Sequence, residues 1–185
     1  MADDCVYVAL GSNLGDREAH LEGAVRALAS SAGIELLAIS PVYETAPVGP
    51  PPQGHYLNAV LRLRTTLTPR ALLERQLEVE ASAGRERGER DAARTLDVDL
   101  LLFGARVVDE PGLVVPHPRM SERAFVLEPL CDLAPELRHP TLGLTIEELV
   151  RRVRDPAAVT RYRGFALGPA GWRESDEPTR HTESP

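Results

Sequence analysis

The chain has 185 residues, of which 43% are hydrophobic and 26% charged, as expected for one globular domain with its own core. Its formal net charge of −7 argues against a general binder of nucleic acid or of anionic membranes, because both need a basic face. Cys5 and Cys131 lie far apart, and no apolar run approaches the ~18 residues of a membrane-spanning helix. We therefore expect reduced thiols, a cytoplasmic location, and no nucleic-acid or membrane partner. We also expect a monomer.

The first third of the chain predicts a strand, a helix and a second strand. Residues 5–10 predict a buried strand and residues 34–40 another. Between them the turn Gly11-Ser12-Asn13 either presents backbone groups to a ligand or only accommodates a positive φ. A helix is expected from Asp16, as its N-cap, to Gly33, because four apolar residues recur at helical spacing. These are Leu21, Ala24, Val25 and Leu28.

A long irregular loop is predicted next, followed by a strand with two distinct faces. Prolines and glycines between residues 41 and 55 exclude a regular element there, and so long a loop favours a functional segment over a plain surface connector. Residues 56–65 alternate as a strand, which places Tyr56 and Asn58 on the same face. Such a pair can stack a flat ring and bind its edge, although it is also common on a half-exposed strand. The opposite face carries Leu57, Ala59, Leu61 and Leu63, while Val60 and Arg62 accompany Tyr56 and Asn58.

Thr68-Pro69 predicts the start of another helix, which Gly84 ends. Leu73, Leu77 and Glu80 follow the helical period, so Glu80 is expected to project from the buried stripe. A buried carboxylate needs a partner, which is either an arginine of the following loop or a ligand. That loop, residues 85–94, contains four arginines.

Residues 94–103 predict a strand that carries two carboxylates on one face. Asp97 and Asp99 are separated by one residue, or about 6–7 Å along a strand at ~3.3 Å per residue. Two carboxylates at this spacing repel each other, and a divalent cation, or two, would remove the conflict. Oxygen ligands of this kind suit Mg²⁺, which fills its other positions with water and substrate phosphates. The alternative is a solvated edge strand with two exposed carboxylates. The opposite face carries Leu96, Val98, Leu100 and Leu102.

The last third of the chain predicts shorter elements. Residues 107–108 predict a short strand, Pro116-His117-Pro118 an extended segment, and Ser121 the cap of a short helix that carries Phe125. Thr145 and Glu148 form a capping-box pattern for a helix that reaches about Val153. From about Gly168 the sequence is polar and proline-rich. We expect a domain over residues 1–167 and a disordered tail over residues 168–185.

Four blocks of the chain resemble one family. The block Arg90-x-Ala92-Ala93-Arg94-Thr95-Leu96-Asp97-Val98-Asp99-Leu100-Leu101 closely resembles the signature of the 6-hydroxymethyl-7,8-dihydropterin pyrophosphokinases of the folate pathway. The other blocks occur in the order of that family, from about residue 5 to 165. They are Gly11-Ser12-Asn13-Leu14-Gly15, Tyr43-Glu44-Thr45-Ala46-Pro47 with Tyr56-Leu57-Asn58-Ala59, and Pro116-His117-Pro118-Arg119-Met120 with Arg123-Ala124-Phe125.

The resemblance implies an α+β, ferredoxin-like three-layer αβα sandwich with a mainly antiparallel sheet, where patterns alone predict only a mixed α/β protein. It implies transfer of pyrophosphate from the co-substrate ATP to the hydroxymethyl group of the dihydropterin, with AMP released and two Mg²⁺ ions as cofactors. The family's roles fall on catalytic Arg85 and Arg94, metal-binding Asp97 and Asp99, ATP-binding Glu80, Arg87, Leu100, His117 and Arg123, and pterin-binding Gly11, Thr45, Ala46, Val48, Tyr56, Asn58 and Phe125.

The chain departs from the family at a few positions. Asp91, Ala92 and Ala93 replace an aromatic residue and Gly-Pro, which puts in doubt how the arginine-rich loop seals the pterin pocket. Pro118 stands where an aromatic residue is common, and Ala46 where the family often has Pro. Two alternatives remain. A phosphohydrolase would need a further ligand cluster or a water-activating group. A non-catalytic nucleotide- or pterin-binding module of the same fold would be expected to lose an arginine or a carboxylate of the site.

Overall fold

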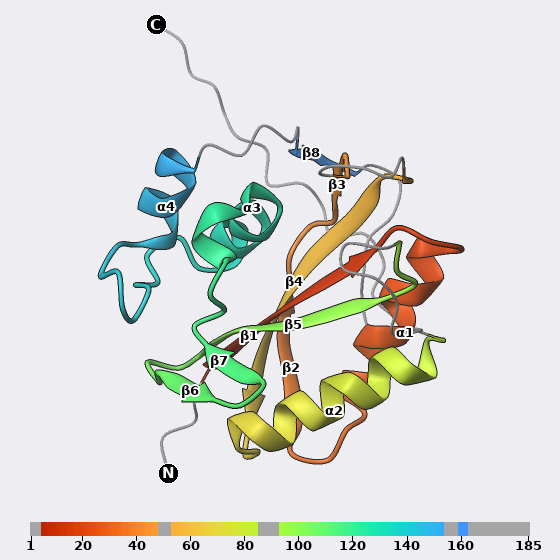
Figure 1. The fold of residues 1–185 in the computed structure, drawn as a ribbon, viewed down its shortest axis with the longest axis horizontal. Helices are drawn as coiled ribbons and strands as arrows, with labels where there is room; N and C mark the ends of the chain where they lie inside the picture. Colours follow the sequence, from red (N-terminus) through yellow and green to blue (C-terminus); the bar gives the residue numbers. More distant parts are fainter. Residues whose placement is uncertain (1–4, 48–52, 85–92, 154–158, 163–185) are drawn as a thin grey trace, which may run out of the picture.

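A six-stranded antiparallel sheet lies at the centre of the molecule (Figure 1). The computed structural model describes residues 5–47, 53–84, 93–153 and 159–162. Strand β1 pairs along its full length with the central strand β4, and on its other side it pairs with β5. The strands are β1 (Cys5–Ser12), β2 (Ile34–Ile39), β3 (Tyr43–Thr45), β4 (Tyr56–Thr65), β5 (Asp97–Phe103) and β8 (Val159–Arg161).

The connections between these strands follow the ferredoxin-like pattern that was predicted. In chain order the elements run β1-α1-β2, β4-α2-β5, and the strand order in the sheet is β5-β1-β4, with β2 and β3 both pairing with β4. Each helix therefore crosses over the sheet and skips a strand position, which leaves every neighbouring pair antiparallel. The predicted α+β fold with an antiparallel sheet is confirmed.

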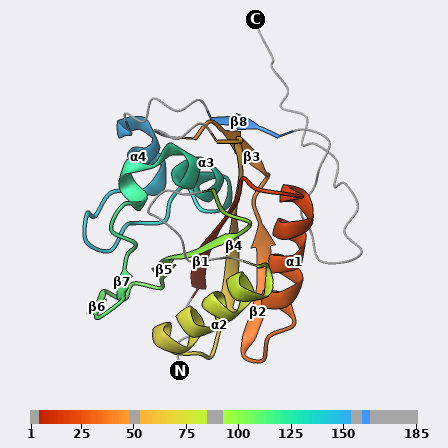
Figure 2. The same ribbon diagram turned by 45° about the vertical axis from the view of Figure 1, so that its right-hand side comes forward.

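Helices cover both faces of the sheet, so the molecule has three layers (Figure 2). Helices α1 and α2 pack on one face, where the aliphatic side chains of β1, β4 and β5 form the larger core. Helices α3 and α4 pack on the other face against a second, smaller core. The helices are α1 (Arg17–Ala29), α2 (Pro69–Ser82), α3 (Ala124–Leu133) and α4 (Ile146–Arg152), together with a 3₁₀ turn η1 (Met120–Glu122).

Three of the helices begin directly after a residue whose side chain caps the helix. Asp16 accepts a hydrogen bond from the backbone N–H of Ala19, and Thr68 caps α2 in the same way. Thr145 and Glu148 form the predicted capping box of α4. The prediction for Ser121 was wrong: it lies inside η1, and α3 begins after Arg123 without a side-chain cap.

The strand β3 contradicts the prediction that residues 41–55 contain no regular element. Tyr43, Glu44 and Thr45 pair with β4 on one side and with β8 on the other. Local composition favoured a loop because prolines flank this segment, but pairing with two distant strands supplies the missing backbone hydrogen bonds. β3 brings Thr45 beside Tyr56, which places the start of the long loop next to the predicted ring-binding face.

Two apolar stripes differ from the predicted ones. The register between β1 and β5 shifts at Tyr7, so Leu101 is an extra residue and Leu102 packs in the α3–α4 core instead of beside Leu100. In α2, Leu77 is exposed, and the buried stripe is shifted by one residue although it still contains Glu80. It consists of Leu72, Gln76, Val79 and Glu80.

The remaining described elements lie at the edges. The short strand predicted at residues 107–108 is part of a hairpin of β6 (Val108–Glu110) and β7 (Leu113–Val115). Across the described ranges, no helix is long and apolar enough to cross a membrane. The predicted tail, residues 168–185, lies outside the described residues, and the domain boundary at residue 167 stays a prediction.

Candidate active site

The two carboxylates predicted on one strand face do lie on one face of β5, away from α1 and α2. Asp97 is opposite Gly11 of β1, and Asp99 is opposite Ala9. The small residues leave open space over the sheet beside the carboxylates. A Cβ on Gly11 would lie 3.3 Å from Asn58 Oδ1 and 3.8 Å from Asp97 Cβ. A side chain at position 11 would therefore occupy the space between Asn58 and Asp97. Glycine at position 11 therefore keeps this floor open.

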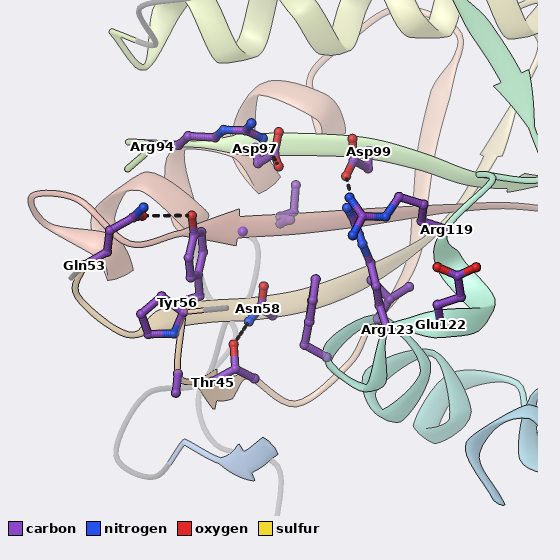
Figure 3. Close-up of a pocket in the computed structure, with 17 residues that line it drawn as sticks. Thr45, Gln53, Tyr56, Asn58, Arg94, Asp97, Asp99, Arg119, Glu122 and Arg123 are labelled. Carbon is purple, nitrogen blue, oxygen red and sulfur yellow. Dashed lines mark hydrogen bonds and ion pairs between the residues drawn. The ribbon is translucent and has the colours of Figure 1, made fainter. Parts of the chain in front are cut away.

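A cleft of about 370 Å³ opens over this floor (Figure 3). It has the size of a small-molecule site. Ten of the residues predicted from the sequence line it, and they come from β1, β3, β4, β5, α3 and the segments that flank them. They are Gly11, Thr45, Ala46, Tyr56, Asn58, Arg94, Asp97, Asp99, Arg123 and Phe125. The structure thus brings the predicted metal-, phosphate- and pterin-binding residues into one cleft.

Arg94 lies beside the first carboxylate. Its Nη1 donates to Asp97 Oδ2 at 2.8 Å, and both side chains are largely buried, at 28% and 23% exposed. Burial lowers the pKa of Arg94, but the charge of Asp97 and its hydrogen bond outweigh this effect, so the net pKa is raised. The guanidinium is therefore a permanent positive charge on the floor of the cleft.

The second carboxylate faces two further basic side chains. Asp99 Oδ2 lies 3.9 Å from Arg123 Nη1 and 3.9 Å from His117 Nε2. Burial, followed by the charge of Arg123, lowers the pKa of His117 to about 4, so its ring is neutral at pH 7. The backbone N–H of Arg119 donates to His117 Nδ1 at 3.2 Å, which places the proton of the neutral ring on Nε2. His117 therefore presents an N–H donor toward Asp99.

The other end of the cleft is a polar and aromatic wall. Asn58 Nδ2 donates to Thr45 Oγ1 at 2.9 Å, and both side chains are buried. This bond orients the Asn58 amide so that its Oδ1 faces Gly11 and the cleft. Tyr56 lines the cleft beside Asn58, and Phe125 lines it from α3. Two aromatic side chains and a fixed amide are suited to a flat ring with a hydrogen-bonding edge.

Asn13 joins the two loops that border this cleft, and sequence reasoning assigned it no site role. Its Nδ2 donates to Gln53 Oε1 at 2.9 Å, and its Oδ1 accepts from the backbone N–H of Arg94 at 2.8 Å. Gln53 also accepts from the Tyr56 hydroxyl at 3.5 Å, a long hydrogen bond. The buried Asn13 thereby ties the loop before β4 to the segment that carries Arg94.

Several predicted site residues lie outside the lining of the cleft. Glu80 reaches β5 from α2, and its Oε1 accepts from the backbone N–H of Val98 at 2.7 Å, whereas the sequence predicted a loop arginine or a ligand as its partner. Leu100 is packed in the α1–α2 core, and His117 contacts Asp99, with Nε2 3.9 Å from Oδ2, without lining the cleft itself. The assignments of Val48, Arg85 and Arg87 fall outside the described residues.

The structure adds lining residues that the sequence did not single out as site residues. Arg119 and Glu122 come from the start and end of η1, and Gln53 from the loop before β4. Arg119 belongs to one of the family-like blocks, but nothing in its spacing indicates that it faces Asp99. The other added residues are Ala9, Leu10, Pro47 and Val126.

Carboxylates and arginines that converge beside a ring-binding wall define a class: enzymes that transfer phosphoryl groups to a small cyclic acceptor. Comparison with known proteins specifies this class further. Residues 7–135 match the family 7,8-dihydro-6-hydroxymethylpterin-pyrophosphokinase (HPPK). The chain belongs to this family, as the resemblance predicted.

Named relatives agree with the family match. A Bacillus subtilis protein named 2-amino-4-hydroxy-6-hydroxymethyldihydropteridine pyrophosphokinase is 39% identical over 161 residues, which covers 86% of this chain and 96% of the relative. A Pseudomonas aeruginosa protein of the same name is 47% identical over 145 residues, which covers 78% of this chain and 89% of the relative.

Solved structures agree in fold. The HPPK-DHPS protein of Plasmodium falciparum matches 80% of this chain with a TM-score of 0.61 and 16% sequence identity. An HPPK-DHPS in complex with substrates matches 82% of it with a TM-score of 0.65 and 12% identity. The match covers only 43% of the length of each of those two chains. At this identity the likeness supports the fold alone.

Proposed function

We propose that this protein transfers a diphosphate group from ATP to the hydroxymethyl group of 6-hydroxymethyl-7,8-dihydropterin and releases AMP, a step of folate biosynthesis. The hydroxymethyl oxygen attacks the β-phosphorus of ATP. The new P–O bond forms as the bond to the oxygen between the α- and β-phosphates breaks, AMP leaves with that electron pair, and the hydroxyl proton passes to solvent. The observation that carries the proposal is one cleft that joins a carboxylate pair and arginines to a ring-binding wall.

The donor set suits Mg²⁺. Asp97 and Asp99 supply carboxylate oxygens from one face of β5, and both are partly exposed to the cleft. Among the described residues, no group of three or more His, Cys, Asp or Glu side chains gathers as a complete protein cage. The remaining positions would fall to water and phosphate oxygens, the arrangement that Mg²⁺ takes in nucleotide sites. Asp97 and Asp99 would hold two Mg²⁺ ions, whose charge would offset that of the triphosphate.

The arginines of the chain act by position and charge. Arg94 is held at Asp97, and in this proposal its guanidinium stabilises the charge that develops on the phosphate oxygens. Arg123 lies beside Asp99, and the neutral His117 presents its Nε2–H on the same side. Because positioning and electrostatics carry most of phosphoryl transfer, no dedicated base is required. Arg85 has the corresponding catalytic role in this proposal. Arg87, Glu80 and Leu100 are proposed as further ATP contacts.

The pterin binds at the Tyr56 and Asn58 end. Its flat ring lies between the aromatic side chains of Tyr56 and Phe125, and Asn58 Oδ1 accepts from the ring's polar edge. The Thr45 side chain is already paired with Asn58, so the backbone from Thr45 onward provides the other edge contacts. Gly11, Ala46 and Val48 complete the proposed pterin site.

The test is AMP formation from Mg-ATP, with and without 6-hydroxymethyl-7,8-dihydropterin, for the wild type and for Asp97→Ala. We expect pterin-dependent AMP that falls by at least a factor of 10³ in the variant, because several kcal/mol of charge stabilisation depend on the metal site. ADP or inorganic phosphate as the product would overturn the proposal. The alternative, a non-catalytic binding module, predicts tight nucleotide binding without turnover. Arg94, Asp97 and Asp99 together in one cleft favour catalysis.

We further propose a monomeric, cytoplasmic enzyme. Among the described residues, the exposed large apolar side chains are Leu14 before α1, Leu77 in α2, Val107 and Val114 at the β6–β7 hairpin, and Leu142 before α4. Scattered residues of this kind do not require a partner. A mass near 20.2 kDa by light scattering after gel filtration is expected, and twice that mass would contradict the monomer.

A further inference from the structure

A third arginine, Arg119, faces the cleft, and its side chain has no partner among the described residues. Its side chain lines the cavity and is exposed to it. Within the part of the chain that the structure describes, its guanidinium forms no hydrogen bond and no ion pair, whereas Arg94 is bonded to Asp97 at 2.8 Å. An arginine with five donors aimed at a binding cleft is therefore available to a ligand.

The backbone of Arg119 is held in place by two hydrogen bonds. Its N–H donates to His117 Nδ1 at 3.2 Å, and its carbonyl accepts from the N–H of Glu122 at 3.2 Å. The next residue, Met120, is fully buried in the α3–α4 core. Because the backbone of Arg119 is fixed, less conformational freedom is lost when its guanidinium binds a ligand.

Two guanidinium groups gather at the Asp99 end of the cleft. In Figure 3 the side chains of Arg119 and Arg123 both extend toward Asp99. The pKa of Arg123 is lowered, chiefly by burial and next by the charge of Arg119, which means that the two groups are near each other. Asp99 Oδ2 lies 3.9 Å from Arg123 Nη1, which is too long for a direct hydrogen bond. An anion between the two arginines would remove this repulsion.

The geometry points to Arg119 as a further phosphate-binding arginine that, with Arg123, holds the α-phosphate of the nucleotide. This inference rests on the proposed function. Tyr56 and Asn58, at the proposed ring site, lie at one end of the cleft, and the two arginines lie at the other, beside Asp99 (Figure 3). A triphosphate attacked at its β-phosphorus from the ring side must direct its α-phosphate, and the AMP that leaves, toward Asp99. Arg119 thus binds the leaving group, and it is expected to affect ATP and AMP affinity and not pterin affinity.

Glu122 provides an internal check on this assignment. It lines the same end of the cleft, one 3₁₀ turn after Arg119. A carboxylate beside an anion site repels phosphate. Glu122→Gln is therefore expected to tighten nucleotide binding slightly, by about twofold, while Arg119→Ala weakens it.

The experiment is calorimetric titration of the full-length protein with α,β-methylene-ATP, with AMP, and with adenosine, each in the presence of Mg²⁺. We expect Arg119→Ala to raise the Kd of the methylene analogue and of AMP about tenfold, the scale of one partly exposed charge-assisted contact. Adenosine binding should be unchanged, and Arg119→Lys should recover part of the loss, because lysine keeps the charge but not the planar fork. The matched control is Arg26→Ala, an exposed arginine of α1 in a surface ion pair with Glu22.

The outcomes separate this inference from the proposed function. If Arg119→Ala binds the phosphate-containing ligands as the wild type and Arg26→Ala do, the inference is wrong. An equal loss for adenosine would also overturn it, since that result assigns Arg119 to the nucleoside. If the wild type binds the methylene analogue but forms no AMP with pterin, the proposed function is wrong. The inference about Arg119 is then still tested by the Kd values of the phosphate-containing ligands. Because the side chain is exposed and unpaired, thermal unfolding of Arg119→Ala should match that of the wild type.

Discussion

The hydrogen bond from Val98 to Glu80 predicts that α2 helps to hold the metal-binding strand in place. Val98 lies between Asp97 and Asp99, and its backbone N–H donates to Glu80 Oε1 at 2.7 Å. Glu80 is only 5% exposed, so water cannot replace the carboxylate as a partner. The change Glu80→Ala removes this acceptor, so the buried N–H of Val98 loses this hydrogen bond.

The expected cost follows from these contacts. A buried donor left without a partner costs ~1–3 kcal/mol, and deletion of buried side-chain atoms adds roughly 1 kcal/mol. We therefore expect Glu80→Ala to lower the free energy of unfolding by about 2–4 kcal/mol, which corresponds to a fall in Tm of about 4–16 °C for a domain of this size. Glu80→Gln keeps a neutral acceptor and should lose about half as much, because charge-assisted hydrogen bonds are roughly twice as strong.

The assay is thermal unfolding followed by circular dichroism, and α2 offers a matched control. Glu78 is 63% exposed and pairs with Arg75 at 2.6 Å on the helix surface. Glu78→Ala should change stability by less than ~1 kcal/mol, since an exposed ion pair contributes little. Equal melting temperatures for Glu80→Ala and Glu78→Ala would refute the reasoning. The KM for Mg-ATP of Glu80→Gln should also rise, because the backbone between the two carboxylates is less constrained.

Two further predictions concern the loops and the pH response. Because the pKa of His117 falls from 6.5 to about 4 on folding, only the unfolded chain takes up a proton at this residue as the pH drops below 6.5. The free energy of unfolding therefore falls between pH 6.5 and pH 4, by up to about 1.4 kcal/mol per pH unit. Urea unfolding at pH 7 and at pH 5 should show a smaller fall for His117→Asn than for the wild type. An unchanged pH slope would contradict this. For Asn13→Ala, which loses the bonds to Gln53 and to the Arg94 backbone, we expect a roughly tenfold rise in the pterin KM from steady-state kinetics. The same KM as the wild type would mean that Asn13 does not order the pterin side.

Local patterns in the sequence predicted those features that depend on a few neighbouring residues. The faces of β4 follow from strict alternation between Tyr56 and Thr65, and the bounds of this strand match the prediction. The pair Asp97 and Asp99 shares a face because strand side chains alternate. Thr145 and Glu148 mark the start of α4 through a capping box that spans four residues. Each of these interactions is complete within one segment of the chain.

The tertiary structure decided the features whose partners lie far apart in the sequence. β3 forms because β4 and β8 supply backbone partners on both sides, although its own flanks are rich in proline. The register shift at Tyr7 turns Leu102 to the other face, and no periodicity within β5 signals it. Val98 provides the partner of Glu80 across 18 residues. Such pairings depend on the packing of whole elements, which local spacing does not encode.

The candidate site divides in the same way. The residue types that carry the chemistry can be identified from the sequence alone, because carboxylates and arginines keep their charge wherever the chain places them. Their arrangement in one cleft, the tie from Asn13 to the Arg94 backbone, and the unpaired Arg119 beside Arg123 became visible only once β1, β4, β5 and η1 were placed next to one another. The physical reason is that binding depends on distances across the sheet, and these distances are set by strand pairing and helix packing between segments up to a hundred residues or so apart.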